Sequence, residues 1–375
     1  MKYKSIITAI AFFFFISGTI TNKAAPLTQT EKEVRETVLD RKIHIEKDLI
    51  LDIPYVPCYC DTLNIKKSRI NIGDCELYVE MEGKGMPLIL IHGGPGATHH
   101  YFHPFFSQAR DFAQIIYYDQ RGCGLSEFNK GAGYSVDQAV DDLEFLRKAL
   151  NLPRWILMGH SYGGLLAQSY AVKYPESFAG LVLVSSHPAF LHLSFLGFSK
   201  RQNEYLAEEE KERIREIHEL YLAKKLSVEQ TLYNAFLNGD WKRQNFYKPS
   251  KERLSQIALY EWKHDADFND VMSRDTRRIN LKGAFENCPI PTLIIEGQWD
   301  LSASFDKPGI FHKNHPRSQL IIFEQSGHRP FADEPERFLQ ILRDFLENLP
   351  QVSKKDLDSW KEHLLSRKKP KDKKD

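Results

Sequence analysis

The sequence predicts an α/β fold: a mostly parallel, doubly wound sheet into which a helical cap is inserted. Two observations predict the sheet, since short apolar runs without polar alternation are typical of strands buried on both faces, and helical patterns separate several of these runs. A third observation predicts the cap, because only helical patterns are found between residues 187 and 288. The expected buried strands cover residues 88–91, 115–118, 155–158, 181–184, 293–295 and 320–323.

The first residues have the pattern of an export signal. Lys2 and Lys4 precede an apolar run over residues 6–16, and polar residues follow. Because this run is short for a membrane span, we expect a signal peptide over residues 1–25 and a periplasmic or extracellular protein. The alternative is an uncleaved segment that anchors the chain to a membrane. Residues 26–67 are polar and are expected to form an extension on the surface.

The core is expected to comprise residues 68–186 and 289–350, on either side of the cap. It begins with a hairpin, because strand signals flank the turn Gly73-Asp74. Helical spacing of apolar residues predicts helices between the strands and after the last one. These helices cover residues 136–150, 165–174 and 335–346, and the cap has a helical pattern over residues 200–225.

Composition and charge limit the class of protein. The 375 residues are 42% hydrophobic and 27% charged, which is the balance of a globular protein rather than of a disordered or fibrous one. The formal net charge is +1, and residues 366–375 of a Lys-rich tail over residues 351–375 hold six Lys or Arg against two Asp, which is a net +4, so the rest of the chain is mildly acidic. We expect this tail to be solvated, or to contact an anionic surface. Within the body of the chain, no basic stretch is interleaved with aromatic residues, so a nucleic-acid partner is not expected.

The chain has five cysteines, so at least one is unpaired within the chain if the protein is exported and oxidised. Cys58 and Cys60 could form a metal or redox pair. Since no second ligand pair with suitable spacing follows them, we expect neither a metal site nor a cofactor.

The motif G-H-S-Y-G at residues 159–163 follows one expected strand and opens one expected helix. In this setting the motif forms a sharp turn that presents its serine hydroxyl above the sheet. Glycines on both sides of the serine let the backbone pack where a Cβ atom would collide. Ser161 is therefore the candidate nucleophile for attack on a carbonyl group.

A serine nucleophile needs a base to take its proton, and the base needs a carboxylate to orient it. Two of the late strands run into loops that contain Asp300 and His328. The order Ser161, Asp300, His328 is the chain order of the catalytic triad in the α/β-hydrolase fold. Asp306 is a rival acid, but it lies further along in a polar loop.

The carbonyl oxygen gains negative charge during such a reaction, and backbone N–H groups commonly stabilise it. One expected donor is the N–H of Tyr162, directly after the nucleophile. The other should come from the loop H-G-G-P-G at residues 92–96. Gly94 is the expected donor there, because Pro95 has no N–H.

Three motifs together resemble the prolyl iminopeptidase family of α/β-hydrolases. They are H-G-G-P-G at residues 92–96, D-Q-R-G-C-G-L-S at residues 119–126 and G-H-S-Y-G-G at residues 159–164. The resemblance covers roughly residues 68–186 and 289–347, and the first two motifs are far more specific than the third. The second motif follows a strand end, where Arg121 is expected to fix the loops around the site with its hydrogen-bonding fork.

The resemblance implies an aminopeptidase that releases an N-terminal residue, often proline, through an acyl-enzyme. Its substrate is then a peptide or small molecule with a free N-terminus, and a carboxylate near the cap pairs with the α-ammonium group. Some relatives carry an acidic residue directly after the triad aspartate, where this chain has Leu301. Glu261 and Glu204, both in the expected cap, are the candidate replacements.

Two alternatives stay open. A serine esterase or another acyl hydrolase needs the same triad but an apolar cap without an ammonium site, and Leu301 favours it. A non-catalytic binding protein of the same fold is the second alternative, although the presence of all the chemical residues argues against it. Epoxide hydrolases and haloalkane dehalogenases fit poorly, because they need a carboxylate nucleophile where this chain has Ser161.

Overall fold

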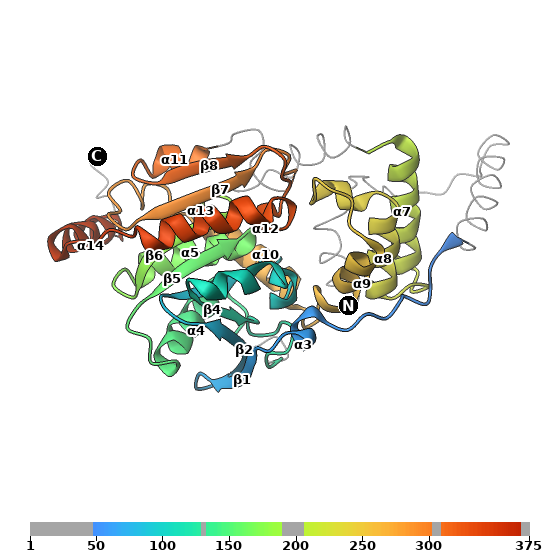
Figure 1. Ribbon diagram of the computed structural model, residues 1–375, viewed down its shortest axis with the longest axis horizontal. Coiled ribbons are helices and arrows are strands. Elements are labelled where there is room, and N and C mark those ends of the chain that lie inside the picture. Colours follow the sequence, from blue (N-terminus) through green and yellow to red (C-terminus); the bar gives the residue numbers. More distant parts are fainter. Residues whose placement is uncertain (1–47, 129–132, 190–205, 302–308, 369–375) are drawn as a thin grey trace, which may run out of the picture.

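The computed structural model describes residues 48–128, 133–189, 206–301 and 309–368, and one eight-stranded sheet forms its centre (Figure 1). The strand order is β1-β2-β4-β3-β5-β6-β7-β8. β1 and β2 form the predicted hairpin and β2 pairs antiparallel with β4, whereas all later pairings are parallel. The predicted mostly parallel sheet is confirmed. The strands are β1 (Lys66–Asn71), β2 (Glu76–Gly83), β3 (Pro87–Ile91), β4 (Gln114–Tyr118), β5 (Trp155–His160), β6 (Phe178–Val184), β7 (Thr292–Gly297) and β8 (Gln319–Phe323).

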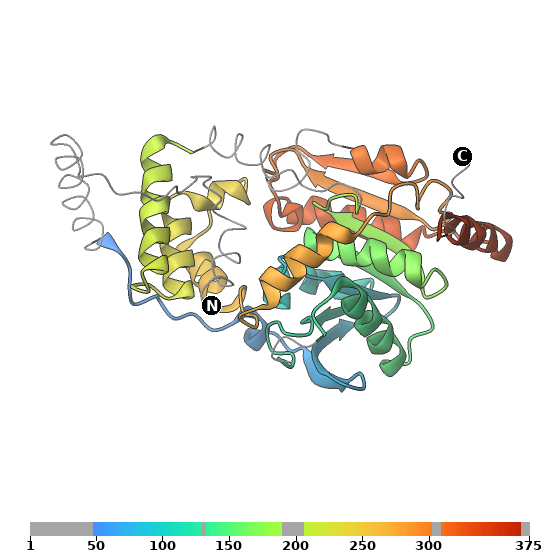
Figure 2. The same ribbon diagram turned by 180° about the vertical axis from the view of Figure 1, so that it is seen from behind.

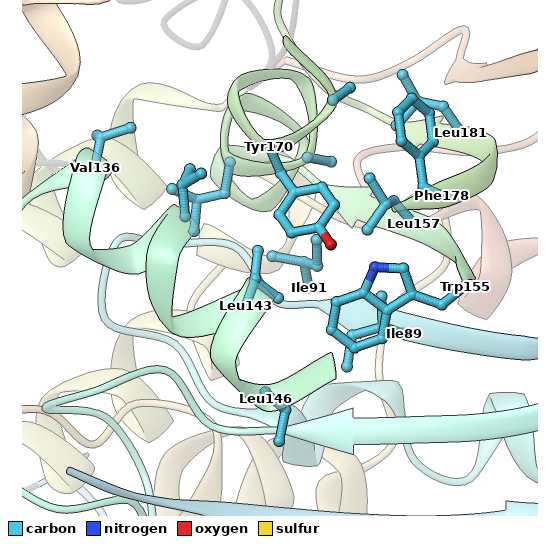
Figure 3. Packing of buried hydrophobic residues seen from close by; sticks show 14 of the residues in the cluster. Ile89, Ile91, Val136, Leu143, Leu146, Trp155, Leu157, Tyr170, Phe178 and Leu181 are labelled. Atoms are coloured by element: carbon cyan, nitrogen blue, oxygen red, sulfur yellow. The ribbon is translucent and has the colours of Figure 1, made fainter. Parts of the chain in front are cut away.

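Helices cover both faces of the sheet, and each face has its own buried apolar cluster. Along β3, Ile89 and Ile91 join one cluster while Leu88 and Leu90 join the other, because successive strand side chains point to opposite faces. Figure 3 shows part of the first cluster, around Trp155. The first face is covered by α4 (Val136–Ala149), α5 (Tyr162–Lys173), α10 (Phe268–Asp275), α11 (Ile310–Asn314) and α14 (Lys354–Lys368), and the second by η1 (His99–Phe102), η2 (Phe105–Asp111), α12 (Pro330–Asp333) and α13 (Pro335–Glu347).

A group of cap helices stands beside the sheet, at one end of the molecule (Figures 1 and 2). α8 and α9 are each preceded by an N-cap serine, Ser227 and Ser250, whose hydroxyl accepts an N–H from the first turn. The cap helices have an apolar cluster of their own, which includes Phe236 and Ile257. The helices of the cap are α7 (Glu208–Leu222), α8 (Val228–Leu237), η3 (Asp240–Arg243) and α9 (Lys251–Tyr260).

The described part of the extension runs along the cap to the sheet and ends in α3 (Tyr59–Thr62) (Figure 1). Asn234 of α8 binds both backbone groups of Ile50: its Oδ1 accepts the N–H at 3.0 Å and its Nδ2 donates to the carbonyl oxygen at 2.9 Å. Gln256 and Tyr260 of α9 donate to carbonyl oxygens further along the extension. Side chains of two cap helices therefore hold this segment in place.

Two segments differ from the prediction. The tail is not solvated throughout, because α14 buries Trp360 and Leu364 in the first cluster, and Trp360 Nε1 donates to the carbonyl oxygen of Ala284 at 2.8 Å. Phe268 of α10 and Phe285 also belong to the first cluster. The cap therefore ends well before residue 288, where the sequence predicted its end. In both segments a few apolar side chains pack on the core among many charged residues.

The predicted signal peptide lies outside the described residues. Within the described ranges, no helix combines the length and the apolar character that a membrane span requires.

Candidate active site

Ser161 sits in a strained turn between β5 and α5. Its backbone has φ 55° and ψ −124°, and a positive φ is unusual for a residue with a side chain. The turn is closely packed, since a Cβ atom on Gly163 would lie 2.1 Å from the carbonyl oxygen of Ile91. One on Gly159 would lie 2.4 Å from the carbonyl oxygen of Gly163. Glycine is therefore required at both positions, which is the geometry that the elbow motif predicts.

Asp300 and His328 lie in the loops after β7 and β8 and are hydrogen-bonded to each other. His328 Nδ1 is 2.8 Å from Asp300 Oδ2, and both residues are buried. Because a carboxylate only accepts, Nδ1 carries the proton and Nε2 keeps a lone pair. A base that takes a proton from a serine hydroxyl requires this tautomer. Asp306, the rival acid, lies outside the described residues.

A chain of hydrogen bonds joins the loop after β3 to the loop of His328. The Gly93 N–H donates to the Tyr101 hydroxyl at 2.6 Å, and this hydroxyl is 2.9 Å from His160 Nδ1. His160 Nε2 is 2.8 Å from the carbonyl oxygen of His328. Since a carbonyl only accepts, Nε2 carries the proton and the Tyr101 hydroxyl donates to Nδ1. Burial lowers the pKa of His160 well below its usual range, so the ring stays neutral and keeps these roles.

Tyr101→Phe is expected to reduce activity by breaking this chain. The change leaves the Gly93 N–H and His160 Nδ1 without a partner, at a cost of roughly 1–3 kcal/mol for each buried group. If only about 1 kcal/mol of this cost reaches the transition state, kcat falls by about fivefold, because 1.4 kcal/mol corresponds to a factor of ten. KM should change less, since Tyr101 positions the backbone rather than the substrate. Steady-state kinetics of the variant measure both constants.

Tyr118→Phe is the matched control. Tyr118 is also fully buried, but in the described part of the chain its hydroxyl has no hydrogen-bond partner. We therefore expect this variant to keep both kcat and KM. Equal kcat values for the two variants would mean that the hydrogen-bond chain has no part in catalysis.

The two predicted oxyanion donors lie in neighbouring segments, since a Cβ atom on Gly93 would lie 2.9 Å from the Cβ atom of Ser161. Tyr162 is the first residue of α5, and the first N–H groups of a helix have no partner within the helix. Gly94 has φ 117°, and a Cβ atom there would lie 2.4 Å from the backbone nitrogen of Gly96. Because the Gly93 N–H already donates to Tyr101, Gly94 stays the candidate donor of this loop.

Glu261 is buried between two arginines. Its side chain is 1% exposed, forms an ion pair with Arg253 and lies 2.9 Å from Arg329 Nη1. Arg329 directly follows His328 in the chain. The sequence suggested that Glu261 pairs with a substrate ammonium group. Because its carboxylate already pairs with two guanidinium groups, Glu261 is not free to do so. Its carboxylate instead holds the cap to the loop of the candidate base. Glu204 lies outside the described residues.

The D-Q-R-G motif holds the loops behind the site, and the predicted structural role of Arg121 is confirmed. Its guanidinium makes a bidentate pair with Asp142 of α4, at 2.7 and 2.9 Å. A second pair with Asp74 of the β1–β2 turn has distances of 2.7 and 3.1 Å. The first residue of the motif, Asp119, accepts a hydrogen bond from His99 Nδ1 at 2.8 Å.

Sequence reasoning missed Tyr101 and Arg329 as residues of the site. The Arg329 guanidinium lies over the Tyr101 ring, 5.2 Å from its centre. A charged residue next to the candidate base could have indicated Arg329, because a buried charge needs a counter-charge. The run of aromatic residues around Tyr101 looks like core packing, so no pattern singles out its hydroxyl.

Known proteins are similar to this chain in sequence. Residues 86–335 match the family model described as the alpha/beta hydrolase fold. A proline iminopeptidase of Lactobacillus acidophilus is 30% identical over 283 residues, which cover 70% of this chain and 90% of that protein. Proline iminopeptidases of Clostridium botulinum and Saccharolobus solfataricus are 29% and 26% identical, and each match covers 77% of this chain. The matches cover 97% and 94% of those two proteins.

Solved structures share the fold. A proline iminopeptidase of Mycobacterium smegmatis superposes with a TM-score of 0.58 at 22% identity, covering 78% of this chain and 100% of that chain. An esterase of Exiguobacterium antarcticum has a TM-score of 0.58 at 21% identity, covering 76% of this chain and 100% of that chain. At such low identity the superpositions establish the architecture alone, whereas the match to the family model and the sequence relatives extend over most of the chain. This chain belongs to the proline iminopeptidase family of α/β-hydrolases.

Proposed function

We propose that this protein is a serine aminopeptidase that releases N-terminal proline, or another small apolar residue, from peptides. The observation that carries the proposal is the hydrogen bond between His328 and Asp300, in loops beside the strained turn of Ser161. The His160–His328 contact brings the serine turn and the loop of the candidate base together. The substrate class is supported by the relatives, which are proline iminopeptidases and which this chain matches over most of their length.

In the proposed reaction, His328 Nε2 takes the proton of Ser161 Oγ as this oxygen attacks the carbonyl carbon of the first peptide bond. Asp300 orients the imidazole and stabilises its protonated form. The N–H groups of Tyr162 and Gly94 stabilise the negative carbonyl oxygen. The protonated imidazole then gives its proton to the leaving amine. A water molecule, activated by the same ring, releases the amino acid from the acyl-enzyme.

Recognition of a free α-amino group separates this activity from that of an esterase. A charge-assisted hydrogen bond to an ammonium group contributes about 1.5–3 kcal/mol, which corresponds to roughly one to two powers of ten in kcat/KM. Because Glu261 is already paired with two arginines, Glu204 stays the predicted carboxylate for this contact.

Three substrates test the proposal: a prolyl arylamide with a free amine, its N-acetylated counterpart and a short-chain aryl ester. We expect kcat/KM for the free arylamide to exceed that for the acetylated one by roughly ten- to a hundredfold, because only the free amine carries the charge. If the acetylated arylamide were cleaved as fast as the free one, the aminopeptidase proposal would be wrong. Rapid turnover of the ester alone would support an acyl hydrolase instead.

Glu261→Gln is expected to destabilise the protein and to slow all substrates alike. Removing one partner of a buried ion pair costs about 3–5 kcal/mol, since it leaves Arg253 and Arg329 without their counter-charge. Thermal denaturation measures the stability, and rates on the free arylamide and the ester measure the effect on the site. The control is Glu324→Gln, which removes an exposed partner of Arg337 and should change neither. A loss confined to the free arylamide, at unchanged stability, would restore Glu261 as the ammonium ligand.

We also propose that the protein is exported to the periplasm or the extracellular space. The support is the sequence pattern of Lys2 and Lys4 followed by an apolar run over residues 6–16. N-terminal sequencing of the native protein tests this, with a new N-terminus between residues 18 and 26 as the expected result. A cytoplasmic protein that still begins at Met1 would contradict it.

A further inference from the structure

Two thiols and an imidazole converge where the extension, the loop after β3 and the cap meet. The sulfur atoms of Cys58 and Cys60 are 2.9 Å apart. These two sulfur atoms and a ring nitrogen of His100 all lie within 4.8 Å of one another. Cys58 precedes α3, Cys60 lies on α3, and His100 lies on η1. Thiolate sulfur and imidazole nitrogen are the ligands of many structural zinc sites.

The hydrogen bonds around His100 determine which ring nitrogen can bind a ligand. His100 Nδ1 is 2.9 Å from Thr98 Oγ1. The Thr98 hydroxyl donates its only hydrogen to the carbonyl oxygen of Tyr260 at 2.8 Å, so it accepts from Nδ1–H. His100 Nε2 therefore keeps a lone pair. Histidine ligands of metals commonly donate their other N–H to an oxygen in this way, which fixes the ring orientation.

A neighbouring group of Cys60, Glu80 and His99 is less suited to a metal ion, although these side chains also converge. His99 Nδ1 already lies 2.8 Å from Asp119 Oδ1. Glu80 Oε2 lies 3.0 Å from His103 Nε2, and Glu80 Oε1 lies 3.5 Å from His99 Nε2. Because these buried side chains already pair with one another or with Asp119, the cysteine pair and His100 are the better candidate ligands.

We propose that Cys58, Cys60 and His100 bind a zinc ion, with a water molecule as the fourth ligand. Zinc–sulfur bonds of about 2.3 Å at a tetrahedral angle place two sulfur atoms about 3.8 Å apart, so the thiols would separate slightly on binding. A disulfide would instead need about 2.05 Å between them and would involve the two cysteines alone. The ion would fasten α3 of the extension to η1, close to the cap. It takes no part in the proposed reaction.

The test uses the full chain, reduced, stripped of metal with a chelator and then loaded with Zn²⁺ or with Co²⁺ as a spectroscopic probe. Elemental analysis should find one zinc ion per chain. Cobalt should produce sulfur-to-metal charge transfer and the visible bands of a tetrahedral site. Cys58→Ser and His100→Gln should each abolish stoichiometric binding. Cys288→Ala, which removes a buried thiol elsewhere in the chain, should bind metal as the wild type does.

Thr98→Val keeps all three ligands and provides a second variant in case a ligand variant fails to fold. Loss of the oxygen that orients His100 should lower the affinity for zinc by roughly 10- to 100-fold. The proposal is overturned if the reduced wild type takes up no stoichiometric metal, or if Cys58→Ser and His100→Gln bind it with wild-type affinity. A Cys58–Cys60 disulfide in the native protein, together with no metal uptake after reduction, would assign the thiols to a disulfide instead. Because the readout is bound metal, it is independent of the aminopeptidase test.

Discussion

Ser161→Ala is expected to lower kcat by roughly six powers of ten, because the change removes the atom that would form the acyl-enzyme. His328→Ala should cost a similar amount. The double variant should lose little more than either single variant, since the two side chains act as one unit. Initial rates on the free prolyl arylamide, with a large excess of enzyme for the variants, measure the loss.

The fold should survive the serine change, because alanine keeps the Cβ atom and the same backbone. Thermal denaturation checks this. Ser169→Ala is the matched control, since Ser169 lies on α5 and its buried hydroxyl has no hydrogen-bond partner within the described ranges. Full activity is expected for the control. If Ser161→Ala kept activity within tenfold of the wild type, the nucleophile would have to be another residue.

Asp300→Asn is expected to lower kcat by about four powers of ten, with a smaller change in KM. The amide of asparagine can donate a hydrogen bond to His328 Nδ1, which favours the tautomer with the proton on Nε2. That tautomer cannot accept the proton of Ser161. Steady-state kinetics on the free arylamide measure kcat and KM for the variant.

Glu296→Gln is the control for Asp300→Asn. Glu296 is a buried carboxyl group on β7, four residues before Asp300, and burial raises its pKa to about 7. Near neutral pH much of it is already uncharged, so glutamine replaces it with little loss, and we expect near wild-type turnover. If Asp300→Asn were as active as this control, the orienting acid would have to be sought elsewhere, with Asp306 as the first choice.

The central strands could be predicted from sequence because β3 to β7 are buried along almost their whole length and therefore read as apolar runs. α14 could not, since Trp360 and Leu364 stand among lysines and glutamates that suggest a solvated tail. Their burial depends on the first apolar cluster, which other segments supply. The prediction of where the cap ends was wrong for the same reason, because Phe268 packs against the core.

Within the candidate site, the sequence could place Ser161, Asp300 and His328 because each follows the end of an apolar strand. The environment of Glu261 was not predictable. Its partner Arg329 lies 68 residues further along the chain, so the ion pair exists only once the cap has folded over the loop of the candidate base. The aromatic setting of Glu261 suggested a binding site, whereas the structure shows a buried ion pair.

The most direct test of the account is the site of covalent labelling by a serine-directed fluorophosphonate. We expect one adduct per chain, mapped by peptide mass spectrometry to Ser161, with loss of peptidase activity in proportion to labelling. The adduct should be absent from Ser161→Ala and should form much more slowly in Asp300→Asn. An adduct on another residue that abolishes activity, while Ser161 stays unmodified, would contradict the central claim.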